Sequence, residues 1–229
     1  MGLLLNAVKI HKIDADNQHQ LFSIASRIGY AYPPARCRVA SPWVQRWSHL
    51  VKAGGTVLDV ACGQGRHAYW FHALNHPLTL VDQAQAAIES IADTIPSSRC
   101  EAVVADIENG PWPFAGRQFG AVVVTNYLWR PLLPMLLDSL APGGVLIYET
   151  FTQGNETVGK PSRPDFLLRP GELLQVCSGL RVVAFEDGFS SGPDRQTPRF
   201  VQRIAAVREA VVPASPSGPA RYWLTDTQP

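Results

Sequence analysis

The sequence has almost no excess of charge of either sign. Its 229 residues contain 20 Lys and Arg against 19 Asp and Glu, which gives a formal net charge of +1. Proteins that hold nucleic acid or an anionic membrane through a broad electrostatic field carry a basic excess or a basic patch. The balance therefore argues against both partners and favours a small-molecule substrate.

The sequence contains only four cysteines and six histidines, and their spacing does not predict a metal site. His72 and His76 lie at spacings that do not share a helix face with His67, so we expect no metal cluster there. Reduced thiols and a cytoplasmic location are the expectation for scattered cysteines. The four cysteines form no CxxC pair and lie near no histidines at zinc-ligand spacing: Cys37, Cys62, Cys100 and Cys177.

Long apolar runs are missing as well. No stretch approaches the roughly 20 apolar residues of a membrane span. The opening MGLLLNAVKI has no charged segment before its short apolar run, unlike a signal peptide, and Asn6 stands where the myristoylation pattern requires Ser or Thr. We therefore predict no membrane anchor.

The length suits one α/β domain with a sizeable core. Residues 1–40 show weak periodicity and end in the turn-rich AYPPAR, which predicts an irregular N-terminal arm. The domain itself is expected at 41–208. Residues 209–229 are rich in Pro, Ser and Ala and predict a loosely ordered tail.

Strand-like and helix-like segments alternate through the central region. Ser41 and Pro42 are typical of a helix N-cap and a first-turn proline. Helical patterns at 66–75, 83–95 and 129–141 separate short β-branched apolar runs, an order that predicts a doubly wound, mostly parallel α/β sheet of the Rossmann-like class, with about seven strands. Two late runs suit an antiparallel hairpin at the sheet edge. The expected strands are 56–61, 78–82, 101–106, 121–126 and 144–150, followed by the hairpin near 180–187 and 199–207.

The stretch VLDVACGQGRHA, residues 57–68, runs from a predicted strand through a glycine loop into a helix. Gly63 and Gly65 let the backbone approach a ligand, and Ala68 permits close packing of helix on strand. This GxGxxA pattern alone is also found in dinucleotide-binding proteins and in plain turns.

Asp59 distinguishes between a dinucleotide and a cationic ligand as the occupant of the loop. It lies just before the loop, where a dinucleotide pyrophosphate would bring negative charge close to the carboxylate. Two like charges about 4 Å apart repel by roughly 4 kcal/mol at an effective dielectric near 20. S-adenosylmethionine (SAM) carries an ammonium and a sulfonium, for which the same carboxylate is attractive.

Two more acids end the next two predicted strands. Asp82 is placed to accept the ribose hydroxyls, and Asp106 with Ile107 to hold an adenine ring. Taken singly, Asp59 could be a buried turn former, and the other two acids helix caps. Because strands of a parallel sheet end at one edge, the three acids and the glycine loop together favour one ligand site.

These segments resemble class I SAM-dependent methyltransferases of the stand-alone bacterial small-molecule type, over about residues 41–205. The resemblance rests on VLDVACGQGRHA, LTLVDQAQAAI, VVADIENGPWPF and FGAVVVTNYLWRPLLPMLLDSLAPGGVLIYET. It implies SAM as cofactor. The implied cofactor-binding residues are Asp59, Ala61, Gly63, Gly65, Arg66, Asp82, Gln83, Asp106, Ile107 and Asn126.

The acceptor side carries less information. TNYL, at the end of the fourth strand, lacks the prolines of the Pro-Pro-Tyr type motif of related amino-methylating enzymes, which argues against that route. Methyl transfer is an in-line displacement, so alignment can supply much of the rate. The sequence leaves three candidate catalytic groups open: Tyr127, His67 and Glu149. The candidate acceptor contacts lie near Tyr127 and in the long loop after the fifth strand: Tyr127, Trp129, Phe151, Asn155, Arg163 and Phe166.

Two other functions compete with a methyltransferase. An NAD(P)-linked oxidoreductase could use the glycine loop, although Asp59 and Asp106 weigh against it. A non-catalytic SAM-binding partner protein could carry the same motifs. The sequence itself does not name the acceptor.

Overall fold

A computed structural model describes residues 39–191, 198–210 and 220–224. The predicted N-terminal arm lies almost wholly outside the described residues, as does most of the predicted tail. The described residues belong to one compact unit.

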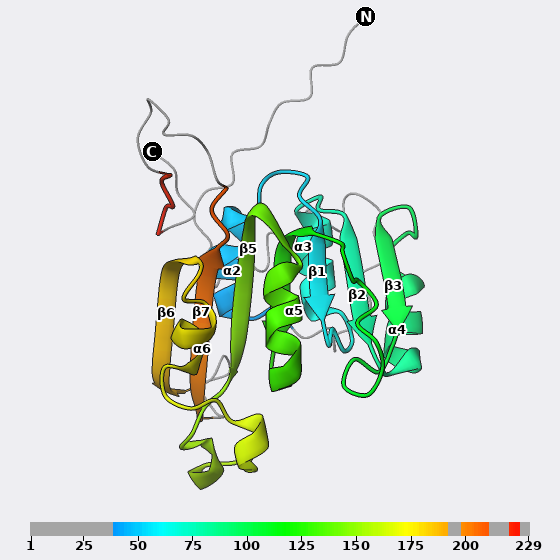
Figure 1. The fold of residues 1–229 in the computed structure, drawn as a ribbon. Coiled ribbons are helices and arrows are strands. Elements are labelled where there is room, and N and C mark those ends of the chain that lie inside the picture. Colours follow the sequence, from blue (N-terminus) through cyan, green and yellow to red (C-terminus); the bar gives the residue numbers. More distant parts are fainter. Residues whose placement is uncertain (1–38, 192–197, 211–219, 225–229) are drawn as a thin grey trace, which may run out of the picture. The chain divides into compact units, whose positions relative to one another are not determined.

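The core of this unit is one seven-stranded sheet with the order β3-β2-β1-β4-β5-β7-β6. The first five strands are parallel, and β7 pairs antiparallel with both β5 and β6 (Figure 1). The predicted doubly wound sheet with an antiparallel edge pair is confirmed. The strands are β1 (Val57–Val60), β2 (Leu78–Asp82), β3 (Cys100–Val104), β4 (Phe119–Thr125), β5 (Leu140–Phe151), β6 (Arg181–Ser190) and β7 (Arg199–Val207).

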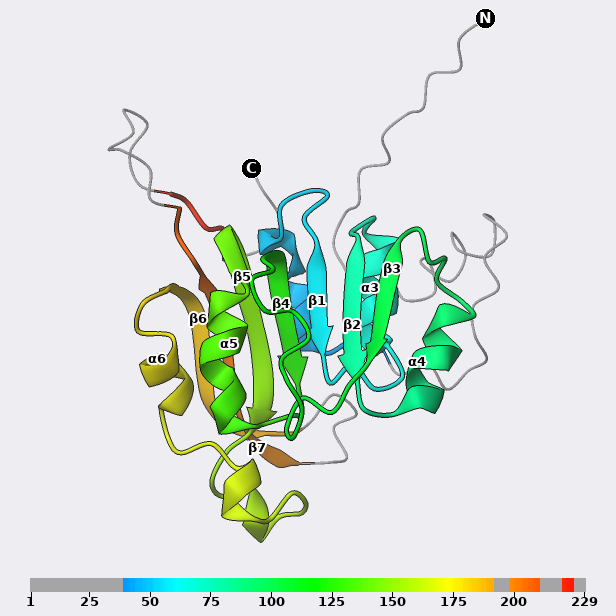
Figure 2. The same ribbon diagram turned by 45° about the vertical axis from the view of Figure 1, so that its right-hand side comes forward.

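Helices cover both faces of the sheet, which explains why its central strands are apolar without alternation. All four residues of β1 are buried, including Asp59. One face carries α2 (Pro42–Trp47), α3 (Arg66–Ala73) and α4 (Gln85–Ala92), and the other carries α5 (Leu133–Asp138) and α6 (Glu172–Val176) (Figure 2). Strands buried on both faces favour continuous Val, Ile and Leu runs, as in TVLDVA and AVVVTN.

Helix α2 begins as its sequence predicts. The Ser41 hydroxyl accepts a hydrogen bond from the Trp43 backbone N–H, and Pro42 occupies the first turn. Trp43, Val44 and Trp47 are buried, and the Trp43 indole donates to the Ile204 carbonyl of β7. The cap and the apolar face thus fix α2 against the antiparallel part of the sheet.

Most elements differ from their predicted bounds by a few residues, and two of these differences bear on the site. Strand β3 ends at Val104, so Asp106 lies two residues beyond it in a turn. The segment predicted as one helix at 129–141 begins with the 3-10 helix Arg130–Leu132 before α5. Pro131 and Pro134 supply no backbone N–H, so they favour a short first turn over a longer α-helix.

Residues 220–224 contact the domain. Tyr222 packs against the core cluster that includes Trp43 and Trp47, and the His49 ring hydrogen-bonds the Trp223 carbonyl. No helix in the described part of the chain is long and apolar enough to cross a membrane.

Candidate functional site

The carboxyl ends of the five parallel strands meet at one edge of the sheet, and the loops that follow them form the candidate site (Figure 1). Four residues in the loops after β1 and β4 have a left-handed backbone: Ala61 with φ 52°, Gly63 with φ 53°, Gly65 with φ 72° and Asn126 with φ 55°. Asn tolerates this conformation because its short polar side chain can hydrogen-bond locally, whereas Ala has no such group and its Cβ atom makes the conformation unfavourable. The loops after β1 and β4 therefore hold unusual conformations at the same edge.

The glycines of the loop after β1 have different roles. A Cβ added to Gly63 would meet no atom within 4 Å, so the loop has open space in front of it. A Cβ added to Gly65 would lie 2.7 Å from the Ile91 Cδ1 atom. Gly65 thus allows α3 to start against α4, and Ala68, fully buried, continues this close packing.

Asp82 ties the glycine loop to the end of β2. Its carboxylate accepts a hydrogen bond from the Gly63 backbone N–H at 2.8 Å and another from the Ala84 backbone N–H at 2.9 Å. Gln83, beside it, is exposed. A carboxylate has about four acceptor positions, so Asp82 retains capacity for further donors.

Asp59 is buried beneath the loop, and its Oδ2 atom has no hydrogen-bond partner in the described part of the chain. Burial raises its pKa to about 7, against the lowering effect of Arg66, while Asp82 raises it further. The Asp59 carboxyl lies 3.9 Å from the His67 Nδ1 atom. Arg66 donates to the Thr125 hydroxyl on β4.

His67 is a buried, neutral side chain. It is 1% exposed, and burial with the nearby Arg66 charge lowers its pKa to about 3. Its Nε2 atom accepts the Ser41 backbone N–H at 3.3 Å. These contacts fit a structural histidine that joins α3 to the start of α2, and they leave His67 poorly placed to act as a base on an acceptor.

Glu149, the second candidate base, lies in a buried polar cluster on the face of the sheet that α2 and α3 cover. Its carboxylate accepts the Ser41 hydroxyl at 3.0 Å and pairs with Arg203 at 2.6 Å and Arg199 at 3.6 Å. The side chain is 1% exposed. The two guanidiniums and the Ser41 hydroxyl thus occupy this carboxylate, which is not free to approach an acceptor.

Asp106 caps its own turn. Its carboxylate accepts the backbone N–H groups of Glu108 and Asn109 and the Asn109 side-chain amide. These hydrogen bonds hold the pKa of Asp106 below its ordinary value. Ile107 is half-buried against the core cluster under α5. The turn therefore presents a fixed carboxylate beside an apolar side chain.

A cavity of about 290 Å³ opens beside the end of β4. The last residues of β5 and the segments that follow β3, β4 and β5 form its walls. The buried Tyr148 hydroxyl donates to the Tyr127 carbonyl, and the Asn126 N–H donates to the Glu149 carbonyl, which fixes the wall after β4. The lining residues are Glu108, Asn126, Tyr127, Leu128, Thr150, Phe151, Pro161 and Phe166.

Three of the six predicted acceptor contacts line this cavity: Tyr127, Phe151 and Phe166. The other three do not. Trp129 packs on the core cluster under α5. Asn155 is buried and braces the loop, donating to the Pro161 carbonyl and accepting from the Phe200 N–H. Arg163 pairs with Asp165 at the surface.

The burial of Tyr127 bears on its chemistry. Burial raises the pKa of its phenol, and the Glu108, Asp106 and Asp82 carboxylates raise it further. The hydroxyl is buried and forms no hydrogen bond of good geometry within the described residues, although the Glu108 carboxylate lies close enough to interact with it. Tyr127 therefore stays a neutral phenol with a hydroxyl available to a ligand.

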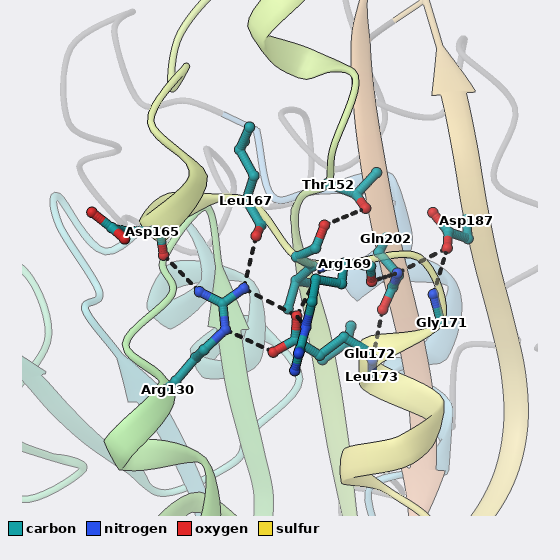
Figure 3. Close-up of polar contacts among 11 residues, drawn as sticks. Arg130, Thr152, Asp165, Leu167, Arg169, Gly171, Glu172, Leu173, Asp187 and Gln202 are labelled. Atoms are coloured by element: carbon teal, nitrogen blue, oxygen red, sulfur yellow. Dashed lines mark hydrogen bonds and ion pairs between the residues drawn. The ribbon is translucent and has the colours of Figure 1, made fainter.

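A polar brace holds the loop that supplies the far wall (Figure 3). Arg130 donates to both oxygens of Glu172, at 2.7 and 3.0 Å, and to the carbonyls of Asp165 and Leu167. Gln202 on β7 accepts the Leu173 N–H and donates to the Arg169 carbonyl (Figure 3). Hydrogen bonds from Arg130 and Arg169 outweigh the effect of burial and lower the pKa of Glu172 to about 2.

Sequence reasoning missed part of the cavity wall: Glu108, Leu128, Thr150 and Pro161. Glu108 follows the Asp106–Ile107 pair directly, and Thr150 precedes Phe151 on β5, so adjacency to candidate residues was an available signal. Among the residues that the structure describes, no group of three or more His, Cys, Asp or Glu side chains could hold a metal ion.

Comparisons with known proteins agree with this arrangement. Residues 57–144, from the start of β1 into β5, match the family model described as a methyltransferase domain. No curated protein sequence matches the chain significantly. The matched range contains the glycine loop, Asp82, Asp106 and Tyr127.

The fold is similar to several solved structures at low sequence identity. TehB from Haemophilus influenzae aligns with a TM-score of 0.59 and 16% identity over 71% of this chain, which spans 60% of the length of that protein. A SAM-dependent methyltransferase from Methanosarcina mazei aligns with a TM-score of 0.58 and 14% identity, covering 76% of this chain and 100% of that one. One from Mesorhizobium loti has a TM-score of 0.54 and 15% identity, covering 71% and 97%. Residues 57–144 therefore match a methyltransferase domain, and the described residues share the Rossmann-like fold of these solved structures.

Proposed function

We propose that the chain binds SAM across the carboxyl ends of β1, β2 and β3 and transfers its methyl group to a small organic acceptor in the 290 Å³ cavity. The observation that carries the proposal is the position of this cavity. It opens at the same edge of the sheet as the glycine loop, and Asn126 and Tyr127 at the end of β4 form part of its wall.

The residues at this edge fit SAM. The open space in front of Gly63 admits a ligand against the loop backbone. The unpartnered Oδ2 atom of Asp59 suits a cationic ligand, directly or through water. Asp82 has acceptor capacity for ribose hydroxyls, and Asp106 with Ile107 offers an acceptor and an apolar surface for adenine. An NAD(P) pyrophosphate would meet the Asp59 carboxylate unfavourably.

Bound SAM supplies an electrophilic methyl group on a sulfonium. The chain's own contribution is binding and alignment. His67 is buried and neutral, and Glu149 is held by two arginines, so neither is a good base. Tyr127 is the remaining candidate, and we assign it an orienting role, because a neutral phenol can donate a hydrogen bond to an acceptor but accepts a proton poorly.

The cavity volume favours a small molecule over a macromolecule as acceptor. Small-molecule sites commonly measure about 300 to 1,000 Å³ and are lined by apolar and aromatic groups with a few polar ones. Five of the lining residues are apolar or aromatic: Tyr127, Leu128, Phe151, Pro161 and Phe166. The near-neutral charge of the chain supports the same conclusion. A cytoplasmic location remains a prediction from the sequence.

Two measurements test the proposal. Calorimetric titration with S-adenosylhomocysteine should show weaker binding to Asp82→Ala than to the parent protein, by tenfold or more, because each lost hydrogen bond to a charged acceptor is worth about 1.5 to 3 kcal/mol. Asp93→Ala, which removes an exposed acid at the end of α4, is the matched control. Transfer of labelled methyl from SAM to a size-fractionated cell extract should then place the label in the small-molecule fraction. Label found in RNA, DNA or protein alone contradicts a small acceptor.

A further inference from the structure

We propose that the cavity selects acceptors in which a positively charged nitrogen group is joined to an apolar body. This inference rests on the proposed function, since it assumes that the acceptor occupies this cavity. It concerns how the acceptor is recognised and leaves the attacking atom open.

The first argument is the aromatic content of the walls. Tyr127 follows β4, Phe151 ends β5, and Phe166 belongs to the loop held by Arg130, so three rings reach the cavity from three segments. The face of an aromatic ring carries negative charge density and attracts cations within about 6 Å. The same rings bury an apolar body by contact area.

The second argument is the charge of the lining. Glu108 is the charged residue among those lining the cavity, and no Lys or Arg lines it in the part of the chain that the structure describes. Burial raises the pKa of the Tyr127 phenol, and the Glu108, Asp106 and Asp82 carboxylates raise it further, so these three acids lie close enough to act on this wall. A cation in the cavity is therefore attracted, and an anion is repelled.

The third argument is that nearby cations already have partners. Arg163 pairs with Asp165 at 2.8 Å and lies over the Phe166 ring, 5.2 Å from its centre, which leaves Tyr127 and Phe151 as the rings without a cation over them among the described contacts. Arg130 pairs with Glu172 at 2.7 Å. Neither guanidinium lines the cavity. Glu108 pairs with no Lys or Arg within the described residues, and it has no role in the proposed SAM site. Its carboxylate therefore remains available to an acceptor.

Thr150 and Tyr127 add polar groups within this apolar surface. Thr150 is 1% exposed and lines the cavity, and the Tyr127 hydroxyl is buried without a hydrogen bond of good geometry. A buried polar group without a partner, such as the Tyr127 hydroxyl, favours a ligand that hydrogen-bonds it. The wall thus suits an ammonium or a similar N–H donor at one end and a hydrocarbon or ring at the other.

A matched series of probes tests this selectivity on the protein saturated with S-adenosylhomocysteine at pH 7.5. The probes are 2-phenylethylamine as the cation, 2-phenylethanol as the neutral compound and 3-phenylpropionate as the anion, each titrated by calorimetry. We expect the amine to bind about tenfold tighter than the alcohol, and the carboxylate to bind most weakly. Glu108→Gln should reduce the preference for the amine to about twofold or less. Glu89→Gln, which removes an exposed acid on α4 outside the cavity, should leave the preference unchanged.

Any of four results would overturn the inference. The three probes could bind equally, or no probe could bind. The carboxylate could bind most tightly, or Glu108→Gln could keep the preference for the amine unchanged. Binding of S-adenosylhomocysteine is measured first in the same titrations. Its absence would count against the proposed function, whereas normal cofactor binding with no amine preference would count against this inference alone.

Discussion

At the scale of single residues, Ala61 has a backbone conformation that its side chain makes unfavourable. Its φ of 52° lies in the left-handed region, where a Cβ atom costs about 1 kcal/mol and glycine costs nothing. We expect Ala61→Gly to raise the free energy of unfolding by about 0.5 to 1 kcal/mol, measured by urea denaturation.

Ala87→Gly, within α4, is the control for the substitution at Ala61. The same change inside a helix should lower the free energy of unfolding by about 1 kcal/mol. A destabilised Ala61→Gly protein would mean that the methyl group of Ala61 makes contacts worth more than the backbone strain.

Asp59 predicts a link between cofactor binding and protons. Its pKa of about 7, against an ordinary 3.8, means that the folded chain binds more protons at this group than the unfolded chain between about pH 4 and pH 7. Stability from this group therefore falls as the pH rises through that window. A cationic ligand nearby lowers the pKa, so SAM binding near pH 6.5 should release protons.

Titration of SAM at pH 6.5 in phosphate and in a buffer of high ionisation enthalpy measures this release directly. The two observed enthalpies should differ for the parent protein and should agree more closely for Asp59→Asn. Identical proton release in parent and variant would remove Asp59 from the coupling.

At the scale of elements, the contact between Arg130 and Glu172 joins the segment after β4 to the start of α6. Glu172 is 5% exposed at its side chain, and replacement by Gln removes its charge and one of the two oxygens that accept from the Arg130 guanidinium and the Arg169 N–H. We expect Glu172→Gln to lower the free energy of unfolding by about 3 kcal/mol. Asp165→Asn, which breaks an exposed pair, should change it by less than about 1 kcal/mol.

The same pair predicts a pH dependence. The folded-state pKa of Glu172 is about 2, below its ordinary 4.5, so its stabilising charge is fully present above about pH 4.5 and is lost as the pH falls toward 2. Thermal unfolding between pH 5 and pH 2 should therefore show a smaller loss of stability in Glu172→Gln than in the parent protein. Parallel pH profiles would contradict this assignment.

At the scale of the whole molecule, burial of the thiols predicts their reactivity. Cys62, Cys100 and Cys177 are buried and free, and burial raises the pKa of each, to about 11 for Cys100 and about 12 for Cys177. The thiolate is the reactive form, so these side chains should react slowly with a disulfide reagent. At most one of the four cysteines should titrate rapidly in the native protein, and all four in denaturant. Two or more fast thiols would show that the core opens readily.

The sequence was sufficient to predict the sheet because its signals are local. Apolar runs, turn residues and the Ser41 cap each act within a few residues, and the order of segments then restricts the topology. The chemistry of His67 and Glu149 could not be predicted in this way. Their partners, Ser41 and Arg203, lie 26 and more residues away in the sequence, and only packing brings them together.

The acceptor cavity shows the same limit. Phe151 and Phe166 were candidates because they lie in a long loop, but the same reasoning also selected Asn155 and Arg163, which serve the loop itself. Which side chains of a loop face the cavity depends on the hydrogen bonds that hold the loop backbone in place. Here those hydrogen bonds come from Arg130 and Gln202, neither of which belongs to the loop.

The order of the two candidate sites along the chain bears on how related proteins could come to differ in their acceptors. Apart from Asn126, the candidate SAM contacts end at Ile107, and the cavity lining begins at Glu108 and ends at Phe166. Recombination near residue 107 would therefore exchange acceptor choice between relatives while each keeps its own cofactor site. The exchanged piece would have to extend at least to Gln202, since a piece that ends with α6 would separate the loop from the strand residue that holds it. If the proposed acceptor site is right, we expect the exchangeable segment for acceptor choice to include the antiparallel strand β7, because β7 supplies Gln202.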